Sequence, residues 1–192
     1  TETVYGLAGN AYAYKAVKEI YNIKRRPKKN PLIIHYENIE KVKKDAVINK
    51  DFLKLYKKFC PGPLTFILKK RKNSKICPAA SANLNTIAVR FPGHKIAKKL
   101  LKKLNFPLAM PSANISSSLS PISALDVADE LGFNREQIRV ELTKEDPGVV
   151  EIVQGGSLSS FQEIVNITVP ETIALDTWLK ELRELLSKIN NG

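Results

Sequence analysis

The chain has 192 residues, and 43% of them are hydrophobic, which is enough for a substantial core in one domain and excludes a disordered chain. Lysine and arginine number 31 against 19 acidic residues, and the formal charge of +12 favours anionic partners such as nucleotides or RNA. No apolar run approaches the ~20 residues that span a bilayer, and the start does not read as a leader, so we expect a soluble cytoplasmic protein without membrane partners.

The first residues, 1–7, pass from hydroxyl side chains through Tyr and Gly into an apolar stretch. Because the chain begins without Met and inside what reads as a motif, we expect a further segment upstream. Residues 11–23 repeat apolar side chains every three or four positions, which predicts an amphipathic helix that ends before Pro27. Residues 32–36 are short, apolar and β-branched, and they predict a buried strand.

A basic run connects this helix to this strand, and five of the residues from 24 to 29 are Lys or Arg. A guanidinium held there can bind phosphate oxygens through two parallel hydrogen bonds, and an ammonium adds a compact point charge. Charge runs are also typical of solvated surface loops. Taken alone, the run therefore leaves open both a polyphosphate site and a plain basic loop.

Helices and strands alternate in the next part of the chain. Residues 52–59 predict a helix that the following Cys-Pro-Gly-Pro stops, and 64–68 and 86–91 predict strands. Residues 96–104 combine an apolar stripe with lysines on the opposite face. Such a helix can lie on a membrane surface or cover a core, and the flanking strands favour the core.

A polar turn with Ser112 and Asn114 comes directly after an apolar strand at 107–110. Ligands bind beyond the strand ends of open α/β sheets, so these side chains are candidate contacts. Turn formation alone explains Ser and Asn there equally well. Ser123 and Asp126 predict a capping box for the next helix, which runs to about residue 131.

The last part predicts strands at 149–153 and 164–168 and a C-terminal helical extension at 170–192, so we expect one domain over residues 1–192. The two histidines lie far apart and the two cysteines lack a second ligand pair, which argues against a metal site built by the protein. A Walker A sequence and a serine nucleophile elbow are also absent. The hydroxyls, cations, imidazole and amide that remain suit phosphoryl or nucleotidyl transfer.

Five blocks of the sequence occur together in an order that is specific to one family, and they are residues 1–7, 24–33, 61–65, 86–92 and 111–114. Through them the chain resembles the threonylcarbamoyl-AMP synthase family, which has a YrdC-like domain. The resemblance implies an α/β (α+β) fold, a twisted mixed sheet with flanking helices around a basic cavity. It also implies a nucleotidyltransferase that joins L-threonine, bicarbonate and ATP, with Mg²⁺ accompanying the ATP. The products would be L-threonylcarbamoyladenylate, for threonylcarbamoyladenosine modification of tRNA, and pyrophosphate.

The resemblance also implies roles for individual residues. Thr3, His35 and Arg90 would bind L-threonine, with Arg90 pairing its carboxylate. Lys24 and Arg26 would be the catalytic cations on the ATP phosphates. The nucleotide would also contact a set of polar side chains, which are Asn30, Thr86, Ser112, Asn114 and Ser120.

The final third departs from the family pattern. Gln162 stands where a serine near the substrate is expected, and Asp176 stands where an arginine should meet phosphate, which an aspartate would repel. Two other functions therefore stay open. One is a weakened paralogue that acts as an RNA-binding module of the same fold. The other is carbamoyl transfer by the related domain of hydrogenase maturation proteins, which the missing accessory motifs disfavour.

Overall fold

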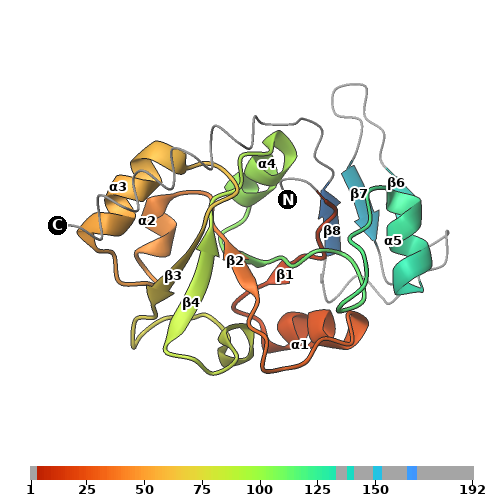
Figure 1. Cartoon of the computed structure of the whole chain (residues 1–192), viewed down its shortest axis with the longest axis horizontal. Coiled ribbons are helices and arrows are strands. Elements are labelled where there is room, and N and C mark those ends of the chain that lie inside the picture. Colours follow the sequence, from red (N-terminus) through yellow and green to blue (C-terminus); the bar gives the residue numbers. More distant parts are fainter. Residues whose placement is uncertain (1–3, 133–137, 141–148, 153–163, 168–192) are drawn as a thin grey trace.

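The computed structural model describes residues 4–132, 138–140, 149–152 and 164–167. Its centre is a five-stranded sheet (Figure 1). Its strands lie in the order β1-β5-β2-β4-β3. The parallel pair is β2 with β4, and the other neighbours are antiparallel, which confirms the predicted mixed sheet. The bounds are β1 Gly9–Asn10, β2 Ile33–His35, β3 Thr65–Lys69, β4 Thr86–Arg90 and β5 Leu108–Ala109.

A second, antiparallel sheet has three strands in the order β6-β7-β8. The two predicted strands of this region are confirmed as β7 (Val149–Ile152) and β8 (Ile164–Ile167), and β6 (Ile138–Val140) was not predicted. The predicted extension 170–192 lies outside the described residues, as do Thr3, Gln162 and Asp176.

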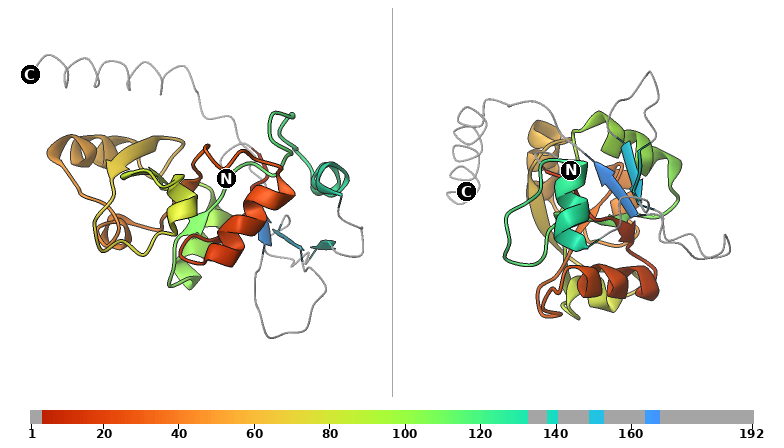
Figure 2. Two further views of the ribbon diagram at one scale, coloured as in Figure 1. Left: turned by 90° about the horizontal axis from the view of Figure 1, so that it is seen from below. Right: turned by 90° about the vertical axis from the view of Figure 1, so that its right-hand side faces the viewer.

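Most of the helices flank the five-stranded sheet, and the last one, α5, lies beside the three-stranded sheet in Figure 1. The four helices that the pattern predicts within the described residues are confirmed. Their bounds are α1 Tyr14–Ile23, α3 Lys50–Phe59, α4 Lys95–Lys103 and α5 Ala124–Leu131, with a short α2 (Ile39–Val42) and a 3₁₀ turn η1 (Pro78–Ser81) in addition. Figure 2 shows α1 and η1 side by side in the view from below, at the edge where β2 and β4 begin. No helix in the described ranges is both long and apolar enough to cross a bilayer.

Side chains at the helix starts explain several of these bounds. The helix predicted from residue 11 begins instead at Tyr14, because Asn10 closes a turn: its Oδ1 accepts from the Tyr12 amide (2.9 Å) and its carbonyl accepts from the Ala13 amide (3.1 Å). The predicted capping box at α5 is confirmed. The Ser123 hydroxyl accepts from the Asp126 amide at 3.1 Å, and the Asp126 carboxylate accepts from the Ser123 amide at 3.0 Å.

The two faces of the sheet are covered differently. Ile34 and Val89 point to one face and are fully buried in the core beneath α1, α3 and η1, where each contributes about 1.5–3 kcal/mol. On the other face, Ala97 and Leu101 of α4 belong to a smaller apolar cluster near β5. The apolar stripe of this helix thus covers a core, as the sequence predicted. Ile67 of β3, on the same face, keeps 68% of its surface exposed. This face is therefore covered over β5 and open over β3.

Candidate functional site

Two of the predicted threonine contacts, His35 and Arg90, end neighbouring strands on the partly open face. They are paired in the parallel register of β2 and β4, so their side chains leave the sheet on the same side. Thr86 and Ala88 alternate onto this side of β4 as well, and both are half-buried. One continuous face thus joins the beginning of β4 to its end.

Arg90 is oriented by a residue to which the sequence analysis gave no role. Its Nε donates to the Oγ1 atom of Thr65 at 2.8 Å, and the two residues face each other in the register of β3 and β4. This bond fixes the plane of the guanidinium, a group that can bind a carboxylate through bidentate hydrogen bonds. Thr65 ends one of the five quoted sequence blocks, and this was the available signal for it.

His35 is a neutral imidazole at this edge. Burial lowers its pKa to about 3, and the nearby charge of Arg90 acts in the same direction. Its Nδ1 donates to the carbonyl of Ile33 at 3.2 Å, because a carbonyl oxygen can only accept. The Nε2 atom is then an acceptor, and it is buried without a hydrogen-bond partner in the part of the chain that the structure describes.

Lys24 lies at the opposite edge of the sheet and is almost fully buried, with 1% of its surface exposed. Its Nζ donates to the carbonyl of Ser112 at 2.5 Å and also to the carbonyl of Asn114. Burial lowers the pKa of Lys24 to about 8, the charge of Arg26 lowers it further, and the charge of Glu130 opposes both. Two cations are thus held near each other, and a bound polyanion would reduce the electrostatic repulsion between them.

Arg26 shapes the basic loop that it belongs to. Its Nε donates to the carbonyl of Asn30 at 3.2 Å and its Nη2 to the carbonyl of Pro31 at 3.0 Å. The loop is also tied to the core, because the Tyr21 hydroxyl donates to the same Asn30 carbonyl at 2.9 Å. The Asn30 side chain is exposed. The run of cations is therefore an ordered loop at the start of β2 and not only a solvated stretch.

The segment 112–118, here called the Asn114 loop, follows β5 at the same edge. Asn114 is 6% exposed, and its Nδ2 donates to the carbonyls of Ile115 (2.7 Å) and Ser118 (2.9 Å). Both amide protons are used, so the orientation of the side chain is fixed. Its Oδ1 is left buried, without a hydrogen-bond partner among the described residues. A buried acceptor in this state is suited to a donor from a ligand.

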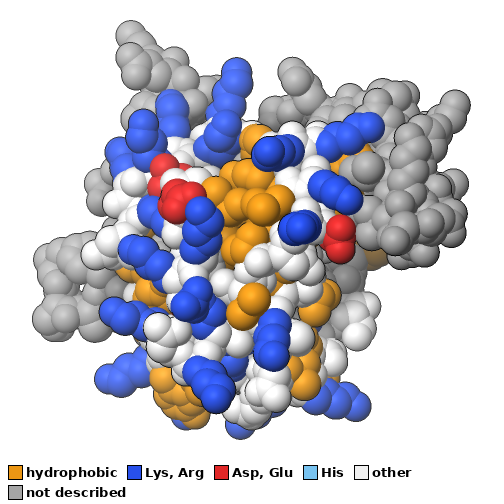
Figure 3. All heavy atoms as spheres, turned by 90° about the vertical axis from the view of Figure 1, so that its left-hand side faces the viewer, with side chains coloured by type: hydrophobic (Ala, Val, Ile, Leu, Met, Phe, Trp, Pro, Cys, Tyr) orange, Lys and Arg blue, Asp and Glu red, His pale blue; other side chains and the backbone are white. Residues whose placement is uncertain are grey.

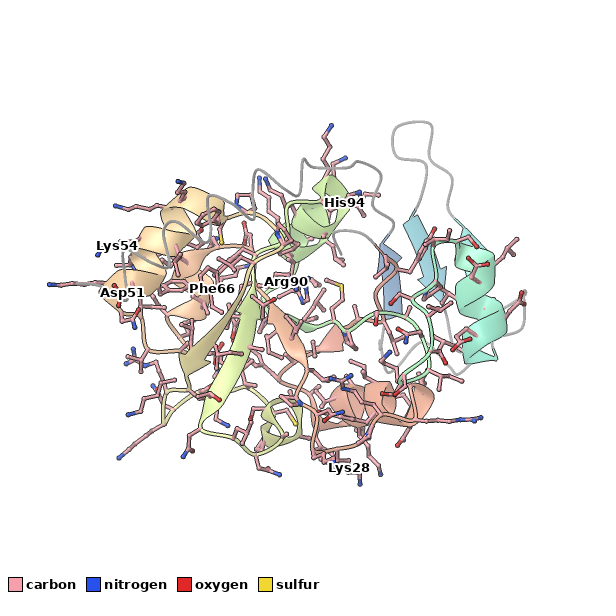
Figure 4. The ribbon with its side chains drawn as sticks, viewed as in Figure 1. Lys28, Asp51, Lys54, Phe66, Arg90 and His94 are labelled. Carbon is pink, nitrogen blue, oxygen red and sulfur yellow. The ribbon has the colours of Figure 1, made fainter. Side chains whose placement is uncertain are left out.

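The structure therefore gathers the candidates in two groups on one sheet. Lys24, Arg26, Asn30, Ser112, Asn114 and Thr86 lie where β2 and β4 begin, and His35 and Arg90 lie where these strands end. The length of β4 separates the groups by roughly 13 Å. Figure 4 shows Lys28 of the basic loop and Arg90 at these opposite ends. Ser120 is exposed between the Asn114 loop and α5, and no hydrogen bond joins it to the other candidates in the described part.

Glu130 of α5 was missed by the sequence analysis. Its Oε1 accepts from the Ile115 amide at 3.2 Å, and its charge acts on Lys24. Nothing in the local sequence distinguishes it from the acidic residues that usually line an exposed helix face.

A family model of known proteins matches this sequence. The model named Sua5_yciO_yrdC, with the description "Telomere recombination", matches residues 1–151. The threonylcarbamoyl-AMP synthase of Pyrococcus abyssi is 47% identical over 134 residues, which cover 68% of this chain and 38% of that protein. The threonylcarbamoyl-AMP synthase of Bacillus subtilis is 42% identical over 132 residues, with coverage of 68% and 38%.

A solved structure shows the same similarity in space. The crystal structure of Pyrococcus abyssi Sua5 complexed with L-threonine superposes with a TM-score of 0.64 at 46% identity, and it covers 68% of this chain and 38% of that one. The chain thus spans about two fifths of the length of these relatives.

Proposed function

Because the chain belongs to the Sua5/YciO/YrdC family, we propose that it makes L-threonylcarbamoyladenylate and pyrophosphate from L-threonine, bicarbonate and ATP. The product would serve the threonylcarbamoyladenosine modification of tRNA. The observation that carries this proposal is the placement of cations at both ends of neighbouring strands: Lys24 and Arg26 precede β2, and Arg90 ends β4. The relatives named threonylcarbamoyl-AMP synthase support the same reaction.

The edge where β2 begins would hold the triphosphate. Arg26 and the exposed cations of its loop supply charge-assisted hydrogen bonds to phosphate oxygens, and Lys24 adds charge from beneath the Asn114 loop. Negative charge grows on the pyrophosphate as it leaves. Cations fixed in advance at that edge stabilise this charge more than they stabilise the bound ATP. Ser112, Asn114 and Thr86 would complete the contacts on this side.

The edge where β4 ends would hold the amino acid. Arg90, held in place by Thr65, would pair with the threonine carboxylate, and the neutral His35 would accept a hydrogen bond from the substrate through Nε2. Bicarbonate takes up a proton and loses water to give carbon dioxide, which the threonine amine captures to give a carbamate and a released proton. A carbamate oxygen then forms a bond to the α-phosphorus while the bond to pyrophosphate breaks. Clamping both substrates on one face keeps these atoms close together.

Mg²⁺ would belong to the nucleotide side of the site. The described part of the chain gathers no group of three or more His, Cys, Asp or Glu side chains. Mg²⁺ is commonly held by substrate phosphates and water with few protein ligands. It would therefore arrive with ATP, and its chemistry would be charge neutralisation on the phosphates.

The test of the proposal is incubation of the full chain with ATP, Mg²⁺, bicarbonate and labelled threonine, followed by measurement of pyrophosphate and of the labelled adenylate. We expect pyrophosphate release that needs both threonine and bicarbonate. Reactions that lack either substrate serve as controls. Pyrophosphate release that is independent of threonine would reject the synthase. Strong RNA binding without any pyrophosphate release would reject it as well and favour the RNA-binding module.

A further inference from the structure

Lys24 and the Asn114 loop form one hydrogen-bonded unit. The lysine side chain donates to the carbonyls of Ser112 and Asn114, and its own carbonyl accepts from the Ser116 amide at 2.8 Å. Two of the three Nζ protons are therefore used on the backbone of the loop. The Lys24 side chain therefore fixes the backbone of the Asn114 loop, and in this way it positions the groups of the loop that would contact a ligand.

Glu130 reaches the same unit from α5. Its carboxylate accepts from the Ile115 amide at 3.2 Å, one residue after Asn114, and its negative charge favours the charged form of Lys24. The charged groups that act on Lys24 are Arg26 from its own loop and Glu130 from α5. Arg26 disfavours the charged form of Lys24, and among the described residues Glu130 favours it.

We infer that Glu130 is a positioning residue for the nucleotide side of the site: it fixes the Asn114 loop through the Ile115 amide and offsets the charge of buried Lys24. The consequence is that Asn114 Oδ1, buried and unpaired within the described residues, is held in place as an acceptor for a donor group of the ligand. This inference rests on the proposed function, because the ligand is the nucleotide. It adds a residue that contacts neither substrate.

The hydrogen bond is tested by hydrogen exchange of the Ile115 amide, measured by NMR on the full chain. Glu130→Ala removes the acceptor, so we expect exchange to accelerate roughly 3- to 10-fold, the range for one lost hydrogen bond. Glu130→Gln keeps an oxygen acceptor and should exchange almost as slowly as the wild type. The matched control is Asp129→Asn, an exposed neighbour on α5, which should leave Ile115 unchanged.

The charge is tested by an NMR titration of the Lys24 side chain and by calorimetry of ATP binding from pH 6.5 to 9.5. Lys24 is charged below its pKa of about 8, so ATP affinity should fall as the pH rises through this value. Glu130→Gln should move both curves to lower pH, because loss of the Glu130 charge lowers the ratio of charged to neutral lysine roughly two- to fivefold. Asp129→Asn should keep the wild-type curves.

Two results would overturn the inference: Lys24 titrating at the same pH in Glu130→Gln and Asp129→Asn, or an Ile115 amide that does not respond to Glu130→Ala. A protein with only a structural glutamate would lose thermal stability in Glu130→Gln without moving the Lys24 titration. Failure of the proposed function looks different. In that case the wild type neither binds ATP nor releases pyrophosphate, while the exchange and titration experiments still decide the role of Glu130.

Discussion

Arg26 and Lys28 belong to the same basic loop but are held differently. The Arg26 guanidinium donates to two loop carbonyls, whereas the Lys28 side chain is exposed. We expect Arg26→Ala to weaken ATP binding by roughly 1.5 to 3 kcal/mol, the range for a hydrogen bond to a charged group. Lys28→Ala removes the same charge and should cost less than about 1 kcal/mol. Calorimetry with ATP measures both, and equal losses would mean that the loop contributes only net charge.

Substitution of Arg90 distinguishes the threonine end of the proposed site from the ATP end. Because it lies at the far end of β4 from Arg26, Arg90→Ala should raise the KM for threonine roughly 10- to 100-fold and leave the affinity for ATP nearly unchanged. Steady-state kinetics with each substrate varied in turn gives the comparison. Arg71→Ala, at an exposed arginine beyond β3, is the matched control. A larger effect on ATP than on threonine would reverse the assignment of the two edges.

His35 couples the site to the stability of the fold at low pH. The pKa of this histidine is about 3 in the folded protein against about 6.5 in an unfolded chain, so below pH 6.5 the unfolded state binds a proton that the folded state does not. Stability is therefore lost as the pH falls. Between pH 6.5 and 4.5 the free energy of unfolding should fall roughly 2 to 3 kcal/mol more in the wild type than in His35→Gln. Urea titrations at both pH values measure it, and parallel losses would show that His35 is not buried neutral.

At the scale of elements, one buried carboxylate joins several segments. Asp45 is 1% exposed, and its Oδ2 accepts from the hydroxyls of Tyr12 (2.8 Å) and Tyr36 (3.0 Å). Its Oδ1 accepts from the Ser74 hydroxyl at 2.9 Å and the Lys75 amide at 3.0 Å. The start of α1, the end of β2, the turn after α2 and the turn after β3 thus meet on one side chain.

Removing that carboxylate leaves buried donors without an acceptor. We expect Asp45→Ala to lower the free energy of unfolding by roughly 2 to 4 kcal/mol, since each unsatisfied buried donor costs about 1–3 kcal/mol and partial relaxation recovers some of it. Asp51→Asn, on the exposed start of α3, should change it by less than about 0.5 kcal/mol. Denaturant melts of both variants give the comparison, and similar stabilities would show that Asp45 is solvated.

The elements that the sequence predicted correctly are those with a long, regular pattern. Helices α1, α3 and α4 and strands β3 and β4 carry five or more residues with clear periodicity, and their ends shift by only a few residues. The two-residue β1 (Gly9–Asn10) and the four-residue α2 carry too few side chains for a period. β1 depends on pairing with β5, and α2 depends on the cap from Asn38. Hydrophobic periodicity along the sequence reveals neither contact.

The site was predictable in part for the same reason. Basic residues on a loop and polar residues after a strand indicate candidate contacts, but not which of them meet. Lys24 and Ser112 are 88 positions apart, and their contact depends on the strand order, which brings the ends of β5 and the start of β2 to one edge. Glu130 acts through other residues and lies in no motif, whereas Thr65 ends one of the five sequence blocks but orients Arg90 only through a contact between two strands.

At the scale of the whole molecule, the charge of +12 is spread beyond the site. Figure 3 shows Lys and Arg side chains over most of one face, with acidic side chains only in isolated places. Such a surface attracts any polyanion, and this attraction weakens steeply with salt. We expect the logarithm of the RNA association constant, measured by filter retention, to fall linearly with the logarithm of salt concentration, and the constant to be unchanged in Arg90→Ala. Salt-resistant RNA binding that depends on Arg90 would place RNA on the candidate site.

The central claim is that one face of the sheet holds ATP at the edge of Arg26 and threonine at the edge of Arg90. The most direct measurement is a crystal structure of the full chain with a non-hydrolysable ATP analogue and L-threonine. We predict triphosphate oxygens within hydrogen-bond distance of Arg26 and of the Asn114 loop, and the threonine carboxylate on Arg90. A nucleotide bound elsewhere, with Arg26 and Ser112 both directed to solvent, would contradict the account.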